Sequence, residues 1–240
     1  MSRDLLYTLR WLINHPGREN KAEALKIIGS LLGESPGESV RNLPTPAAPA
    51  PSHSGPRGRV ALVIGHNSRS KGAYVKGRFN QFEYDFNGEL ASLIQSRAWA
   101  GLELKTFRRV YSGSYTSEIA TVYNKVNAWN PDFILELHFN SYKGGDYSFM
   151  LYHHASAKSK AIAQTVNDVF CAATGFKSNQ KNAGRKSGQR GYVSLAKSKA
   201  PCVLTEPFFE NNPTHLRKIE SLGHSGVAEL YLTAIRKVLS

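Results

Sequence analysis

The chain has 240 residues, and its 31 lysines and arginines outnumber 18 aspartates and glutamates, for a formal net charge of +13. Hydrophobic residues make up 41% of it, which supplies a packed core and argues against a wholly disordered chain. No apolar run approaches the roughly 18–20 residues of a membrane span, and the first residues do not form a secretory signal. Two cysteines exclude a disulfide scaffold and a four-cysteine zinc site.

The basic excess favours a polyanionic partner, such as nucleic acid, an anionic membrane or an acidic cell wall. The charge is unevenly spread, because residues 1–43 carry a net charge of +1 and residues 44–240 carry the other +12. The stretch 177–199 holds seven basic residues and no acidic one. We expect this stretch to form a rim that faces a polyanion, with a merely solvated loop as the alternative.

Residues 1–58 differ in pattern from the rest of the chain. Leucine and isoleucine recur at helical spacing in residues 1–43, which predicts a small helical module. Residues 44–58 are rich in proline and alanine, which predicts an extended linker. The main domain then spans residues 59–240. A module of 43 residues buries little surface by itself, so we expect it to need a partner surface.

Strand and helix patterns alternate along the main domain. Apolar or alternating runs predict strands at 59–65, 103–107, 133–138, 148–153 and 201–206, and a short extended segment at Val193 and Leu195. Amphipathic periodicity predicts helices at 83–99, 117–129, 156–174 and 225–239. Such alternation predicts an α/β fold, with a single mixed, mostly parallel sheet that carries helices on both faces.

Three of the apolar strands end in residues that can bind a metal or move a proton, namely His66, His138 and Glu206. Ligands of open α/β sheets bind at the carboxyl ends of the strands, so we expect these side chains to converge. Two histidines and one carboxylate leave a zinc ion an open position for water. Glu83, at the start of a predicted helix, is the candidate carboxylate. The spacing of these residues forms no local metal motif.

This set of residues resembles the zinc-dependent N-acetylmuramoyl-L-alanine amidases of the amidase-3 type. The resemblance covers about residues 59–222 and rests on four motifs in the family's order: Val63-Ile64-Gly65-His66, Glu83 with Asn87 and Leu90, His138-Phe139-Asn140-Ser141, and Pro201 with Glu206, Phe208 or Phe209, and Asn211. It implies that His66, Glu83 and His138 bind zinc and that Glu206 is the catalytic carboxylate.

Two departures from the family pattern stand next to the implied zinc ligands. The loop after His66 lacks the family's glycines, which leaves its shape open. Glu136 occupies a position that is usually apolar or serine, and it shares a strand face with His138. It could hold His138, act on the substrate or serve as an alternative base, or it could be a surface residue. We therefore keep Glu136 beside Glu206 as a candidate catalytic residue.

The resemblance implies that zinc-activated water cleaves the amide between N-acetylmuramic acid and L-alanine of the peptidoglycan stem peptide. Glu206 would take a proton from water and pass it to the departing amine. Asn140, Arg185 and Arg190 are candidate substrate-binding residues. The last two belong, with Lys181 and Lys186, to a glycine-punctuated loop that we expect to border the cleft and attract the wall.

A phage or prophage endolysin fits these features, made in the host cytoplasm without a signal peptide and acting on the cell wall or periplasm after release. Peptidoglycan is then the expected partner and nucleic acid is not, the small module binds the wall or mediates association, and the oligomeric state stays open. Two alternatives are a zinc amidohydrolase that acts on a small acyl-amino acid and a non-catalytic, basic wall- or nucleic-acid-binding protein.

Overall fold

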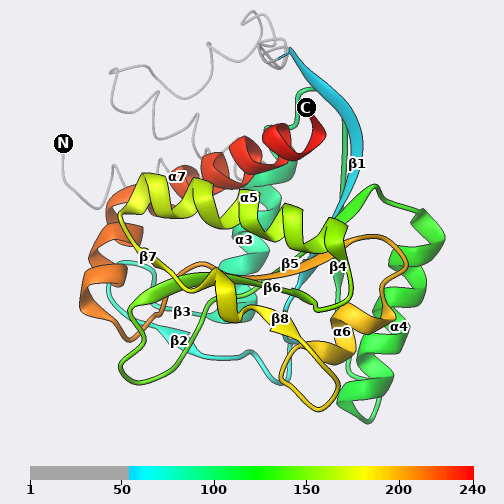
Figure 1. Ribbon diagram of the computed structural model, residues 1–240. Helices are drawn as coiled ribbons and strands as arrows, with labels where there is room; N and C mark the ends of the chain where they lie inside the picture. Colours follow the sequence, from blue (N-terminus) through cyan, green and yellow to red (C-terminus); the bar gives the residue numbers. More distant parts are fainter. Residues whose placement is uncertain (1–53) are drawn as a thin grey trace, which may run out of the picture. The chain divides into compact units, whose positions relative to one another are not determined.

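A central sheet organises the part of the chain that the computed structural model describes, residues 54–240 (Figure 1). The expected helical module (1–43) and most of the expected linker (44–58) lie outside these residues. The sheet has the strand order β4-β1-β5-β9-β6-β7, and β8 pairs with β6. Its strands are β1 (Ser54–Ile64), β4 (Ala100–Arg108), β5 (Phe133–Leu137), β6 (Tyr147–His153), β7 (Lys177–Ser178), β8 (Gly184–Arg185) and β9 (Cys202–Glu206).

Strands β4, β1, β5 and β9 run parallel to one another, and β6 is antiparallel to β9. The helices α3 (Glu83–Ser96), α5 (Ala157–Thr174) and α7 (Pro213–Leu239) pack together on one face (Figure 1). The helices α4 (Tyr115–Trp129) and α6 (Tyr192–Lys197) cover the other face. The expected mixed, mostly parallel sheet with helices on both faces is confirmed.

Burial on both faces explains why the inner strands are continuous apolar runs. Residues 60–64 of β1 are fully buried, and so are residues 133–137 of β5 apart from traces of exposure. A short hairpin, β2 (Tyr74–Val75) and β3 (Gln81–Phe82), leads into α3, and a 3-10 turn at Gln180–Asn182 lies between β7 and β8. Among residues 54–240, no helix has both the length and the hydropathy to cross a membrane.

The first strand begins at Ser54, inside the segment expected to be linker. Ser54 pairs with Ala100 of β4, and Nε1 of Trp99 donates a 2.8 Å hydrogen bond to the carbonyl oxygen of Pro56. A register shift separates Ser54 from Gly58, and pairing with β5 starts only at Val60. Proline has no backbone N–H, and it is tolerated here because this end of β1 pairs only with β4 and not with β5.

One further expectation about local structure is wrong, because Val193 and Leu195 lie in the short helix α6, where both side chains contact the hydrophobic core. The expected helix at 225–239 is present, but it is only the part of α7 that follows a kink at Gly223 (φ 62°), where the backbone is not helical. A helical segment that starts at Pro213 precedes this kink. The side chain of Asn212 caps its first turn by accepting hydrogen bonds from the backbone of Thr214 and His215.

The strand register aligns the carboxyl ends of three strands. Leu137 of β5 stands opposite Ile64 of β1 on one side and opposite Thr205 of β9 on the other. The next residues continue this alignment, because the backbone N–H of His138 donates to the carbonyl of Thr205 at 3.1 Å. The segments that carry His66, His138 and Glu206 therefore leave the sheet at the same edge, as the sequence predicts.

Candidate active site

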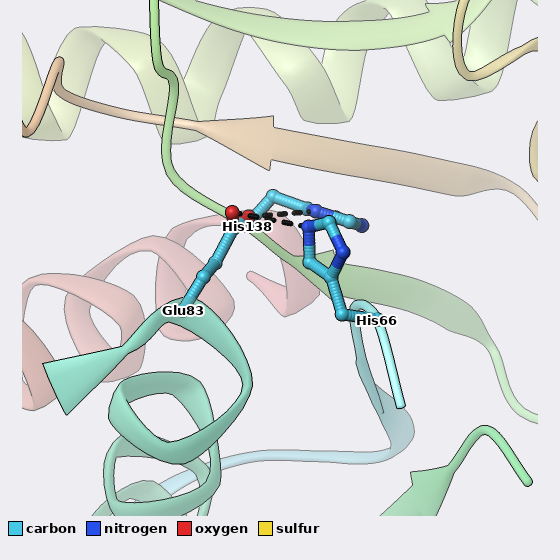
Figure 2. A group of neighbouring side chains, drawn as sticks. All are labelled: His66, Glu83 and His138. Carbon is cyan, nitrogen blue, oxygen red and sulfur yellow. Dashed lines mark hydrogen bonds and ion pairs between the residues drawn. The ribbon is translucent and has the colours of Figure 1, made fainter. Parts of the chain in front are cut away.

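Three side chains from three elements form a group that can hold a metal ion: His66 after β1, Glu83 at the start of α3 and His138 after β5. Nε2 of His66 lies 3.0 Å from Oε2 of Glu83, and Nδ1 of His138 lies 2.9 Å from Oε1 of the same carboxylate. Figure 2 shows the two rings converging on Glu83. One potential ligand atom from each residue lies within 4.8 Å of the others.

The geometry of His66 fits a metal ligand better than a hydrogen-bonding residue. Its Nε2 is buried and, among the described residues, has no partner with hydrogen-bond geometry, even though Glu83 is near. A buried nitrogen without a partner is costly, and a metal ion would satisfy it. His66 also has φ 65°, a left-handed conformation that is rare for a residue other than glycine.

Two glycines leave space around the imidazole rings. A Cβ added to Gly72 (φ 79°) would lie 2.6 Å from Nε2 of His66 and 2.7 Å from Oε2 of Glu83. A Cβ added to Gly65 would lie within 2.6 Å of the ring of His138. At Gly65 and Gly72, any residue other than glycine would therefore place its Cβ in the space next to the ligand atoms.

Glu83 is held as an anion. Burial opposes its ionisation, but the hydrogen bond with His138 and the nearby imidazole of His66 outweigh that penalty and lower its pKa to about 2. The backbone N–H of Phe139 donates to Oε1 at 3.1 Å, and that of Ala73 donates to Oε2 at 3.3 Å. The carboxylate is therefore both charged and fixed in orientation before any metal binds.

Glu136 lies behind His138 on β5. Its Oε1 is 3.2 Å from Nε2 of His138, and its Oε2 accepts a 2.6 Å hydrogen bond from the hydroxyl of Tyr123. Ser194 on α6 donates a longer bond, 3.3 Å, to Oε1. Burial opposes protonation of His138, but hydrogen bonds with Glu136 and Glu83 raise its pKa to about 10. A metal that binds at Nδ1 must therefore displace a proton.

Glu206 occupies the end of β9 with both oxygens in contact with a neighbour. Nδ2 of Asn140 donates to Oε2 at 2.9 Å, and an amino group of Arg190 lies 3.4 Å from Oε1. Burial raises the pKa of Glu206, and the charges of Arg190 and His138 lower it in part. A raised pKa suits a carboxylate that takes up and releases a proton near neutral pH.

An open cleft of about 380 Å³ connects these groups. It is lined by His66, Ser70, Arg109, Tyr115, His138, Leu151, Gly188, Gln189, Arg190, Gly191, Val193, Leu204 and Glu206. Polar groups that can bind a metal or move a proton thus share one hollow with apolar side chains, as ligand sites commonly do.

The structure separates the remaining candidates. Arg190 is exposed and lines the cleft, whereas Arg185 donates to the carbonyl of Asn182 at 2.7 Å and is not among the lining residues. Asn140 is buried and is occupied by Glu206, which favours a role in orienting that carboxylate. Glu136 is absent from the cleft lining and faces His138 instead.

Sequence reasoning missed the network that shapes the loop after His66. Oδ1 of Asn67 accepts hydrogen bonds from the backbone of Arg69 and Ser70, at 2.9 and 2.8 Å. Its Nδ2 donates at 2.8 Å to Glu118, which also accepts from Arg109 at 2.9 Å. Asparagine here turns the chain where the family uses glycines, and the tendency of asparagine to form such turns was the available signal.

The thiol of Cys202 is no candidate nucleophile. It is buried in β9, 3.3 Å from the hydroxyl of Tyr123. Burial, together with the charge of Glu136, raises its pKa, so the thiol stays protonated.

A family model described as N-acetylmuramoyl-L-alanine amidase (Amidase_3) matches residues 60–237. The chain belongs to this family. The match covers most of the length of the amidase. The comparison with curated protein sequences returned no significant match. The family match and the structural neighbours support neither a small acyl-amino acid as the substrate nor a non-catalytic role.

Solved structures of N-acetylmuramoyl-L-alanine amidases and of an endolysin share the fold. The catalytic domain of the CD27L endolysin targeting Clostridia difficile is 26% identical, with a TM-score of 0.61, and the match covers 75% of this amidase and 97% of that chain. The catalytic domain of CwlV from Bacillus (Paenibacillus) polymyxa var. colistinus is 20% identical, with a TM-score of 0.59, and the match covers 75% of this amidase and 98% of that chain. An amidase from Clostridium difficile 630 is 20% identical, with a TM-score of 0.58, and the match covers 78% of this amidase and 98% of that chain.

Proposed function

We propose that this amidase hydrolyses the bond between N-acetylmuramic acid and L-alanine with a zinc ion held by His66, Glu83 and His138, and with Glu206 as general base. The observation that carries the proposal is the convergence of the three ligand atoms within 4.8 Å. Two of the three residues, His66 and His138, line the same cleft as Glu206, a carboxylate of raised pKa. Two imidazoles and one carboxylate are a ligand set of catalytic zinc sites.

A zinc ion in such a site supplies Lewis acidity, which polarises the scissile carbonyl and makes water acidic. Glu206 provides the proton transfer. Its Oε2 is engaged by Asn140, so Oε1 is the atom that accepts a proton from the attacking water. The same oxygen then delivers that proton to the nitrogen of the departing L-alanine, so that the free amine leaves. Arg190 must move from Oε1 when substrate enters.

Replacing Glu206 with glutamine tests this assignment, because it keeps the hydrogen bond with Asn140 but removes the base. We expect the variant to keep its zinc and to lose at least about 10²-fold in turnover, the usual contribution of a general base. His138→Ala is the complementary variant, and it should lose both metal and turnover. A Glu206→Gln variant with normal turnover would assign the base to another residue.

We also propose that the amidase acts as an endolysin, reaching the wall only after the cytoplasmic membrane is opened. Support comes from the similarity to an endolysin catalytic domain and from the basic surface expected of a wall-binding enzyme. The test is expression in a bacterial cytoplasm, followed by chloroform to permeabilise the membrane. We expect lysis only after chloroform. Lysis without permeabilisation would contradict the proposed route.

A further inference from the structure

Six large hydrophobic side chains of the described residues are exposed. They are Tyr74, Phe82, Val110, Tyr111, Tyr115 and Tyr142. Of these six, Tyr115 lines the active-site cleft. Exposed apolar groups that adjoin a ligand site mark an interaction surface more often than scattered ones do.

Three of these side chains lie together between β4 and the first turn of α4. Val110 is 61% exposed, Tyr111 49% and Tyr115 47%. Tyr115 also lines the cleft, beside Arg109. We call Tyr111 and Tyr115 the tyrosine ledge. Tyr115 lines the cleft, and Tyr111 precedes it in the β4–α4 connection, so the ledge adjoins the active site.

Arginines hold both rings of the ledge in place. The guanidinium carbon of Arg69 lies 4.0 Å from the ring centre of Tyr111, and that of Arg109 lies 5.0 Å from the ring centre of Tyr115. Cation–π contacts of this length restrict the motion of the rings. A ligand that binds to them therefore does not have to order these side chains. Arg69 comes from the loop after His66, so the ledge is also tied to the segment that carries a proposed metal ligand.

The chemistry of the ledge fits sugar rings better than anionic groups. The charge of Arg109 is balanced by Glu118 at 2.9 Å, and both side chains are buried. The guanidinium of Arg69 faces a ring. What remains is the exposed, uncharged surface of the two rings. The negative face of an aromatic ring favours C–H groups, such as those of pyranoses, over carboxylates. Carboxylates of a stem peptide would instead favour the free lysines of the loop 181–190.

We propose that the tyrosine ledge binds the glycan chain of the substrate, with Tyr115 nearest the muramic acid at the scissile bond and Tyr111 contacting the sugars beyond it. This inference rests on the proposed function, since it extends the substrate from the cleaved amide to the polymer that carries it. The ledge makes the amidase more efficient on long glycan strands than on a single disaccharide.

The test uses two soluble substrates that carry the same stem peptide, namely glycan strands of several disaccharides and the single disaccharide-peptide. The wild type should have the higher kcat/KM on strands. Tyr111→Ala should lose roughly five- to tenfold on strands, the worth of about one aromatic contact, and should be unchanged on the disaccharide. Tyr111→Phe, which keeps the ring, should behave as the wild type.

Tyr142→Ala is the matched control, because Tyr142 is an exposed tyrosine (66%) that follows β5 and does not belong to the tyrosine ledge. It should be unchanged on both substrates. Peptide-free glycan strands should bind the wild type more tightly than Tyr111→Ala, which is a readout independent of turnover. If Tyr111→Ala lost kcat/KM equally on both substrates, or lost none on strands, the proposed role of the tyrosine ledge would be wrong. A wild type that cleaves neither substrate would overturn the proposed function itself.

Discussion

Glu136 and His138 point to the same side of the strand β5, and the carboxylate contacts the imidazole, Oε1 to Nε2, at 3.2 Å. The second oxygen of Glu136 is fixed by the hydroxyl of Tyr123 at 2.6 Å. A carboxylate in this position holds the ring by its far nitrogen and leaves Nδ1 directed at Glu83. These contacts favour a role for Glu136 in positioning a proposed metal ligand.

The first prediction is that Glu136→Gln weakens zinc binding by about 10- to 100-fold, the usual effect of removing such a partner of a ligating histidine. Competition with a chelator measures the dissociation constant directly. Ser194→Ala, which removes only the 3.3 Å contact to Glu136, should have a smaller effect. If Glu136→Gln bound zinc normally but had lost turnover, Glu136 would be a base and not a positioning residue.

The second prediction compares two glycines with left-handed backbones. Gly72→Ala should lose at least about tenfold in zinc affinity, because the new Cβ would sit 2.6 Å from Nε2 of His66. A Cβ added to Gly113 (φ 91°) would meet no atom within 4 Å, so Gly113→Ala has a similar backbone cost, about 1 kcal/mol, without the clash. Metal content and thermal unfolding of both variants separate the two effects. If Gly72→Ala and Gly113→Ala bound zinc with equal affinity, the assignment of His66 as a metal ligand would be wrong.

The third prediction concerns the acid limb of the pH–rate profile. Glu206 acts as a base only when ionised, so activity falls as the pH drops through its pKa, which burial raises. The positive charge of Arg190 lowers that pKa, so Arg190→Gln should raise it and move the acid limb to higher pH. Lys186→Gln, on the same loop, serves as the control for a general change in charge. A limb that stayed in place or moved to lower pH would contradict the assignment of Glu206.

The fourth prediction refines the expected role of the basic loop. Four basic residues of this loop were expected to attract the wall. The side chain of Arg185 donates a hydrogen bond to a backbone carbonyl, and that of Arg190 contacts Glu206. The other two, Lys181 and Lys186, are exposed. Changing both lysines to serine should weaken sedimentation with peptidoglycan at low salt and reduce its salt dependence, since salt screens interactions between surface charges beyond roughly 8–10 Å. Hydrolysis of a short muramyl peptide should not change. If it fell sharply, the lysines would belong to the catalytic site.

Features that depend on local pattern could be predicted from the sequence. Apolar runs that end in His66, His138 and Glu206 indicate buried strands with polar ends, and parallel strands bring such ends to one edge. The start of α3 at Glu83 follows from its helical periodicity. These few features define the sheet and the candidate metal site.

Features that depend on contacts between distant segments could not be predicted. Tyr123 has the pattern of a core residue of α4, and only the packing of α4 on the sheet brings its hydroxyl to Glu136. Glu118 likewise reaches Asn67 across 51 residues. The expected helix at 225–239 covers only the part of α7 after the kink at Gly223, and the segment from Pro213 to this kink, which Asn212 caps, could not be recognised from periodicity alone.

The most direct test of this account counts new amino-terminal L-alanine residues released from isolated peptidoglycan. The chain stripped of metal by a chelator should release none, and activity should return in proportion to added zinc and level off at one zinc per chain. His138→Ala should release none at any zinc concentration. Release of L-alanine termini by the metal-free chain, or full activity of His138→Ala, would contradict the zinc site on which the proposed function depends.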